Sequence, residues 1–202
     1  MRRSFMTLKY GAHMGIAFRF LRGMSRRMQR VVAWDVRISK ALEARRRHRV
    51  ITWVCVALSW SGAGGVWAAL SIGLWGLLQF DVSVMPRQLD FLRAMATALV
   101  ALIIGSVVKR VVKRSRPFAS THGITRGIWA PGEHHSFPST HAATSVALAV
   151  ALVLIGHPLA WVVSAWAAGV VFSRVWLGVH FPSDVAAGSL LGVLCGALVS
   201  FF

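Results

Sequence analysis

Long runs of apolar residues, separated by short polar breaks, are the feature that most limits how this chain can fold. A helix needs about 20 residues to cross a hydrocarbon layer about 30 Å thick. Four runs after residue 90 approach that length: Phe91–Val112, His141–Ile155, Leu159–Val175 and Val185–Phe202. Because 56% of the residues are hydrophobic and only 14% are charged, too few charged side chains remain to cover a soluble globular domain. We therefore predict a membrane protein whose spans are helices.

A fifth apolar run, Val50–Phe80, is 31 residues long and is interrupted at Ser61–Gly65. This length is too short for two full spans and too long for one straight helix. We expect an interfacial helix over about Val50–Trp60 and then a span from about Gly64 to Phe80. The predicted fold is an all-α, polytopic transmembrane bundle of five spans, or six if this run is divided, plus interfacial helices.

The formal net charge of +17 is concentrated at the N-terminus, since residues 1–49 hold 14 of the 23 Lys and Arg and two of the six acids. Apolar residues recur there at roughly helical spacing, with basic residues between them: Met28, Val31, Val32, Ile38 and Leu42. This pattern predicts a basic amphipathic helix on an anionic membrane surface. A partly disordered, solvated tail is the alternative. We divide the chain into a basic cytoplasmic or membrane-surface extension, 1–49, and a transmembrane domain, 50–202.

Composition also excludes several classes of site and partner. A nucleic-acid-binding domain of this charge would be far more polar, so we expect no nucleic-acid partner. The scattered acids form no carboxylate cluster for a two-metal site, and the CxxC and HExxH motifs are absent. Cys55 and Cys195 lie in apolar runs and are interpreted as small buried hydrophobes. Any catalysis must then rest on His, Arg, Lys and Ser, with no cofactor.

Three polar clusters interrupt the apolar part of the chain. They are Lys109-x6-Arg116-Pro117, Pro138-Ser139-Thr140-His141 and Ser173-Arg174-x5-His180-x3-Asp184. The first ends one predicted span, the second begins the next, and the third joins the last two. Alternate crossing of the membrane therefore puts all three clusters on the same side. Ionisable groups at membrane depth are costly to bury, which favours a functional role for them.

The residue types in these clusters suit phosphoryl transfer. Lys109, Arg116 and Arg174 would bind a tetrahedral dianion, to which an arginine can donate two parallel hydrogen bonds. Ser139 is placed to cap the third span, whose free backbone N–H groups also favour an anion.

Two histidines supply the remaining chemistry of phosphoester cleavage without a metal. One of His141 and His180 would be the nucleophile and the other the proton donor. Asp184, four residues after His180, would hold the other imidazole N–H and fix its tautomer. It is the one carboxylate to which we assign a task. Arg110, Lys113 and Arg114 are interpreted as the basic flank of a span.

Together the three motifs resemble the signature of the type 2 phosphatidic acid phosphatase (PAP2) and haloperoxidase superfamily, in the family's order, over about Lys109–Asp184. The resemblance implies that His180 attacks phosphorus to give a phosphohistidine, that Asp184 orients His180, and that His141 protonates the leaving oxygen. It implies a phosphate site formed by Lys109, Arg116, Ser139, Thr140 and Arg174, with no metal. Thr140 stands where the family usually has glycine, and its side chain narrows the site.

The expected function is an integral membrane phosphatase acting on a lipid phosphate monoester or diphosphate. Phosphatidate, phosphatidylglycerophosphate, a polyprenyl diphosphate and a lipid A phosphate all fit a site at the membrane surface. The alternatives are a lipid phosphotransferase that uses the same site and a non-catalytic basic membrane scaffold. A haloperoxidase is disfavoured by the predicted spans.

We expect a multi-pass protein of the cell (inner) membrane whose residues 1–49 bind anionic lipid. With five spans, the site would share the cytoplasmic face with the basic N-terminus. With six spans, it would face the exterior or periplasm.

Overall fold

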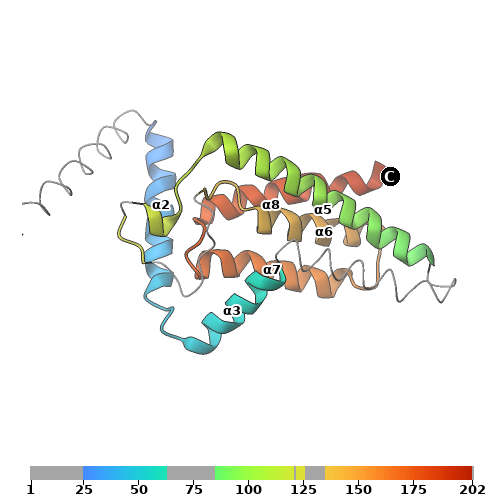
Figure 1. Ribbon diagram of the computed structural model, residues 1–202, viewed down its shortest axis with the longest axis horizontal. Coiled ribbons are helices and arrows are strands. Elements are labelled where there is room, and N and C mark those ends of the chain that lie inside the picture. The colour runs from blue at the N-terminus through green and yellow to red at the C-terminus, as the bar shows by residue number, and fades with distance from the viewer. Residues whose placement is uncertain (1–24, 63–84, 121, 126–134, 202) are drawn as a thin grey trace, which may run out of the picture.

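The computed structural model describes residues 25–62, 85–120, 122–125 and 135–201. All regular structure in these ranges is helical, which confirms the predicted all-α class for this part of the chain. Four long helices lie alongside one another in Figure 1. They are α5 (Met85–Val112), α6 (Thr140–Ile155), α7 (Ala160–Trp176) and α8 (Pro182–Ala197), the last continued by the 3₁₀ helix η3 (Leu198–Phe201).

Two stretches among the described residues are long and apolar enough to cross a membrane, Leu89–Val112 and Pro182–Phe201. Three further apolar helices are shorter: α6, α7 and α3 (Arg49–Ser61). Helix α3 lies where an interfacial helix was expected over Val50–Trp60. The span expected from Gly64 to Phe80 falls outside the described residues.

Small residues bring α8 into close contact with α6. A Cβ added at Gly188 would lie 2.3 Å from the carbonyl oxygen of Ser139, and one at Gly192 would lie 2.6 Å from that of Ala143. Gly196 repeats this contact one turn later, with 2.7 Å to the carbonyl oxygen of Ala147. Glycines four residues apart therefore form one face on which the two helix backbones approach each other, as small-xxx-small patterns do in membrane bundles.

The apolar core lies between α5, α6, α7 and α8 and is also built mainly of small side chains. Its buried members are mostly alanines, together with Leu148, Leu152, Val163, Cys195 and Val199. Cys55 is buried as well, and both thiols are free, as the sequence predicted. Because small side chains leave the helix axes close together, the polar residues at one end of the bundle are brought within reach of each other.

Helix α2 (Arg26–Glu43) lies across the end of the bundle at which α5 and α7 end and α6 and α8 begin (Figure 1). Asp35 and Ser39 are fully buried on one of its faces. Leu42, on the same face by helical spacing, packs against the buried cluster formed by Cys55, Trp176, Leu177 and Val179. The predicted amphipathic helix is therefore present, and part of its apolar face packs against the bundle.

The C-terminal end of α2, the segment after it and α3 add four hydrogen bonds at the same end of the bundle. Arg46 Nε donates to the carbonyl of Trp176 at 2.6 Å, and the N–H of Thr125 donates to Glu43 Oε1 at 2.8 Å. The hydroxyl of Thr125 also donates to Glu43, and this bond is the main reason that the pKa of Glu43 is lowered. The Nε1 of Trp176 in turn donates to Thr52 Oγ1 of α3 at 3.2 Å. Residues 25–62 are thus tied to the end of the bundle that carries the three motifs.

Candidate active site

The second motif lies at the N-terminus of α6, where this helix meets the beginning of α8. Ser139 is the N-cap of this helix, with its Oγ accepting from the N–H of Ala142 at 3.4 Å. The Ser139 N–H donates to the carbonyl of Asp184 at 3.0 Å, so the beginnings of α6 and α8 are joined directly. The positive end of the α6 dipole and its first N–H groups lie at this junction, which favours an anion.

Three cationic side chains converge on this end of the bundle. Arg116 and Arg174 are both only 1% exposed. Arg116 Nη1 donates to the carbonyl of Val179 at 2.9 Å, and Arg174 Nη1 donates to the hydroxyl of Ser59 on α3. Lys109 Nζ donates to Thr140 Oγ1 at 3.3 Å. Burying guanidinium groups is costly unless an opposite charge offsets the lost hydration, and a bound dianion would do so.

His180 lies between the cations and the carboxylate of Asp184. Its Nε2 is 3.5 Å from Arg116 Nη1, and its Nδ1 is 3.9 Å from Asp184 Oδ2. The imidazole is 1% exposed, and this burial, followed by the charges of Arg174 and Arg116, holds its pKa well below the usual value. The ring is therefore neutral at physiological pH and has a lone pair for nucleophilic attack.

Asp184 occupies the first turn of α8 and is completely buried. Its Oδ2 accepts from the N–H of Phe181 at 2.9 Å, and its Oδ1 accepts from Arg114 Nη1 at 2.7 Å. The 3.9 Å separation from His180 Nδ1 is longer than a hydrogen bond. Catalytic hydrogen bonds are often long before substrate binds and tighten afterwards, so this distance is compatible with an orienting carboxylate.

The remaining motif histidine, His141, is the second residue of α6. Its Nε2 is buried and has no hydrogen-bond partner among the described residues. Arg174 and, to a smaller extent, His141 contribute to the lowered pKa of His180, so the two histidines belong to one electrostatically coupled cluster. A buried ring nitrogen without a partner is available for a substrate oxygen.

The structure thus brings the motif residues together at one end of the bundle. Direct contacts join Lys109 to Thr140, Ser139 to Asp184 and Arg116 to His180. All three clusters therefore share one end of the helix bundle.

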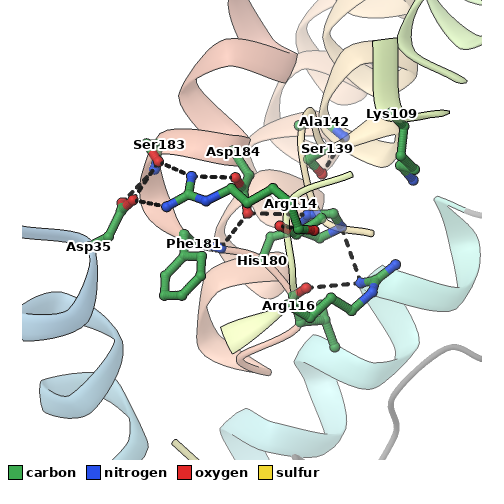
Figure 2. A network of polar contacts seen from close by, with 12 residues as sticks. Asp35, Lys109, Arg114, Arg116, Ser139, Ala142, His180, Phe181, Ser183 and Asp184 are labelled. Atoms are coloured by element: carbon green, nitrogen blue, oxygen red, sulfur yellow. Dashed lines mark hydrogen bonds and ion pairs between the residues drawn. The ribbon is translucent and has the colours of Figure 1, made fainter. Parts of the chain in front are cut away.

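Four residues of this network were not recognised in the sequence: Asp35, Ser59, Arg114 and Ser183. Arg114 was interpreted as a flanking base, yet its guanidinium joins Asp184 and Asp35, at 2.7 and 2.6 Å (Figure 2). Arg114 is therefore tied into the site and does not only flank a span, and a second buried carboxylate, Asp35, belongs to the same network. Asp35 belongs to α2, far from the motifs in sequence, so no local spacing links it to them. Ser59, the partner of Arg174, was missed for the same reason.

Comparison with known proteins adds the family context. Residues 90–202 match the PAP2 superfamily. The chain is 34% identical over 133 residues to the bacitracin transport permease protein BcrC of Bacillus licheniformis, over 64% of this chain and 63% of that protein. It is 38% identical over 119 residues to a decaprenylphosphoryl-5-phosphoribose phosphatase of Mycobacterium tuberculosis, over 58% of this chain and 64% of the relative. The matches thus span a little under two thirds of these relatives.

Solved structures share the fold. A transmembrane PAP2 type phosphatidylglycerolphosphate phosphatase from Bacillus subtilis superposes with a TM-score of 0.65 and 26% identity, covering 88% of this chain and 87% of that one. LpxE of Aquifex aeolicus superposes with a TM-score of 0.62 and 22% identity, covering 82% of this chain and 94% of its own.

Proposed function

The chain belongs to the PAP2 superfamily, and from that premise we propose that it is a membrane phosphatase that hydrolyses a lipid phosphate monoester or diphosphate. The observation that carries the proposal is the position of His180, a buried neutral imidazole with Arg116 on its Nε2 side and Asp184 on its Nδ1 side. A nucleophile, its orienting carboxylate and an anion site are the parts that phosphoryl transfer needs.

In the proposed reaction, Arg116, Arg174 and Lys109 hold the phosphoryl oxygens and offset the charge that builds up on them. His180 Nε2 attacks phosphorus, and a P–N bond forms as the P–O bond to the leaving group breaks. His141 gives a proton to the leaving oxygen, which departs as an alcohol or as a lipid monophosphate. Asp184 accepts the Nδ1–H of His180 and stabilises the positive charge that the ring acquires.

Water then completes the cycle. His141, now neutral, takes a proton from the water as its oxygen attacks phosphorus. The P–N bond breaks, inorganic phosphate leaves and His180 returns to its neutral form. Ser139 Oγ, the α6 N-terminus and the Thr140 backbone contribute to anion binding in both steps. The residues named here supply both proton transfers and the nucleophile, so no cofactor is part of the proposal.

A lipid substrate is favoured by where the site lies. Apolar side chains on the outer faces of α5 and α8 are exposed, among them Leu99, Ile103, Leu190 and Leu194, as expected for helices in contact with lipid. An acyl or prenyl tail can stay in the bilayer while its phosphate reaches the end of the bundle. By their names, the Mycobacterium tuberculosis relative acts on a decaprenyl-linked phosphate and the Bacillus subtilis protein on phosphatidylglycerolphosphate, and we extend only the class of lipid phosphates to the present chain.

We further propose a multi-pass protein of the inner membrane, with five spans and with α2 on an anionic lipid surface. The face of α2 that points away from Asp35 carries Arg30, Arg37 and Lys40, all exposed. Each base near an anionic membrane contributes about 1 kcal/mol of attraction. Near the start of α2, exposed Met28 and Val31 lie on the side that is buried further along the helix, which suits contact with the headgroup region.

The test is a phosphate-release assay on purified protein across phosphatidate, phosphatidylglycerophosphate, a polyprenyl diphosphate and a lipid A phosphate. We expect release from at least one of them and loss of that release in His180→Ala. Addition of acceptor lipids distinguishes a phosphotransferase, which would move phosphate to lipid rather than to water. Release that persists in His180→Ala would refute the proposed role of this histidine.

A further inference from the structure

Helix α2, which lies outside the three motifs, places a carboxylate at the edge of the site. Asp35 is 0% exposed. Its Oδ1 accepts from the N–H of Ser183 at 2.9 Å, and its Oδ2 accepts from the Ser183 hydroxyl at 2.5 Å. The same Oδ2 accepts from Arg114 Nη2 at 2.6 Å. A buried carboxylate with three donors is held firmly, because each donor offsets part of its lost hydration.

Arg114 connects this carboxylate to Asp184 (Figure 2). Its Nη2 binds Asp35, while its Nη1 donates to both Asp184 Oδ1 and Ser183 Oγ, each at 2.7 Å. The guanidinium also lies 4.5 Å above the ring of Phe181. Two edges of one planar group are thus fixed by two carboxylates, so the position of Asp184 depends on where Asp35 holds Arg114.

Without Asp35, the guanidinium of Arg114 would be held on one edge only. The Arg114 side chain is 24% exposed, so it has room to turn toward water once its second carboxylate is removed. Asp184 Oδ1 would then lose a charged hydrogen bond, and its Oδ2 would remain bound to the N–H of Phe181. The carboxylate is already 3.9 Å from His180 Nδ1, and further freedom would lower the fraction of time in which the two groups meet.

We propose that Asp35 is a positioning residue for the catalytic pair His180 and Asp184. By binding Arg114, Asp35 fixes the position of the Asp184 carboxylate relative to His180, so α2 contributes to the active site. This inference rests on the proposed hydrolysis. It does not give Asp35 any contact with substrate. The contacts that Arg116, Arg174 and Lys109 make with Val179, Ser59 and Thr140 do not involve it.

The experiment uses the fact that Asp35 contacts the orienting groups and not the anion-binding groups, so its loss should affect kcat and not phosphate binding. The variant is Asp35→Asn, which keeps the size of the side chain and one oxygen for Ser183 but removes the charge that holds Arg114. Groups that orient a catalytic residue from the next layer typically contribute about 10- to 100-fold in activity. We therefore expect kcat for the best lipid phosphate to fall about 10- to 100-fold, with KM and the inhibition constant of vanadate unchanged within about twofold.

Glu43→Gln is the matched control, because Glu43 is the other acid of α2 and its carboxylate accepts hydrogen bonds from Thr125, on the loop before the second motif. We expect its kcat to equal that of the wild type. Arg114→Gln should lower kcat as Asp35→Asn does, and the double variant should be no slower than Arg114→Gln alone, because both changes break the same connection. Asp35→Glu, which restores the charge, should recover part of the lost activity.

A purely structural role for Asp35 makes a different prediction. In that case Asp35→Asn would lower the temperature of unfolding while the folded fraction, isolated by size exclusion, kept the wild-type kcat. That result, or additive effects in the double variant, would overturn the inference. A vanadate inhibition constant that weakened in parallel with kcat would overturn it too. If the wild type released no phosphate from any lipid, the proposed function itself would fail, which is a distinguishable outcome.

Discussion

Replacement of Gly188 by alanine tests how closely the two helices that carry the site must approach each other. The new Cβ would lie 2.3 Å from the carbonyl oxygen of Ser139, whereas an ordinary contact begins at 3.4 Å. Backbone atoms must therefore separate by about 1.1 Å, and Ser139 must move relative to the first turn of α8. A misplacement of about 1 Å in a catalytic arrangement can cost roughly 100-fold in rate. We expect kcat of Gly188→Ala to fall by about that factor.

Gly196→Ala is the control, because it makes the same kind of contact on the same helix but away from the site. Its Cβ would lie 2.7 Å from the carbonyl oxygen of Ala147. Overpacking of this kind costs about 1–3 kcal/mol of stability, so both variants should unfold at lower temperature. The assay is initial phosphate release by folded, detergent-purified protein. Equal kcat in Gly188→Ala and Gly196→Ala would refute the link between this helix contact and the geometry of the site.

Three further predictions address the anion site, the buried histidine and α2. Thr140→Val should weaken inhibition by inorganic phosphate about fivefold, because Lys109 Nζ loses its hydroxyl partner; this is the equivalent of about 1 kcal/mol for one hydrogen bond. Thr140→Ser, which keeps the hydroxyl, should leave the inhibition unchanged. Equal effects of the two substitutions would contradict this role of the hydroxyl. The stability of the ligand-free protein should fall as pH drops below about 6.5, the ordinary pKa of histidine, because His180 takes up a proton when unfolded but resists it when folded. Thermal unfolding from pH 7 to pH 5 should therefore show a shallower slope in His180→Asn, and identical slopes would exclude His180 as the cause. Hydrogen exchange in the backbone of α2 should be slower in anionic than in zwitterionic nanodiscs, and 1 M salt should remove the difference. Equal exchange rates in the two kinds of nanodisc would argue against binding of α2 to anionic lipid.

The sequence predicted most of the helical boundaries because apolar runs end where polar residues begin. The run Leu159–Val175 corresponds to α7, Ala160–Trp176, and the run His141–Ile155 to α6, Thr140–Ile155. The turn between these helices begins at Gly156, which ends α6 in a left-handed conformation with a φ of 74°. Such boundaries are set locally, by hydropathy and by one or two residues with special backbone requirements.

The part of the site that the sequence left out depends on contacts between distant segments. Arg114 meets Asp35 across 79 positions, and Arg174 meets Ser59 across 115. No spacing rule connects such pairs, because their proximity follows from how α2 and α3 pack on the bundle. Arg114 was misinterpreted because a base at the end of an apolar run has the pattern of a membrane flank. The motif residues could be identified because, within each of the three motifs, they follow one another at a fixed short spacing in the sequence.

The most direct test of the central claim is to trap phosphate on His180. Protein mixed briefly with a labelled lipid phosphate and quenched at alkaline pH, where phosphohistidine survives, would be digested and analysed by mass spectrometry. The account predicts phosphate on the peptide that contains His180, formed within one turnover and lost when turnover continues. It predicts none in His180→Ala. Rapid phosphate release with no label on His180, or label on another residue, would contradict nucleophilic attack by this histidine.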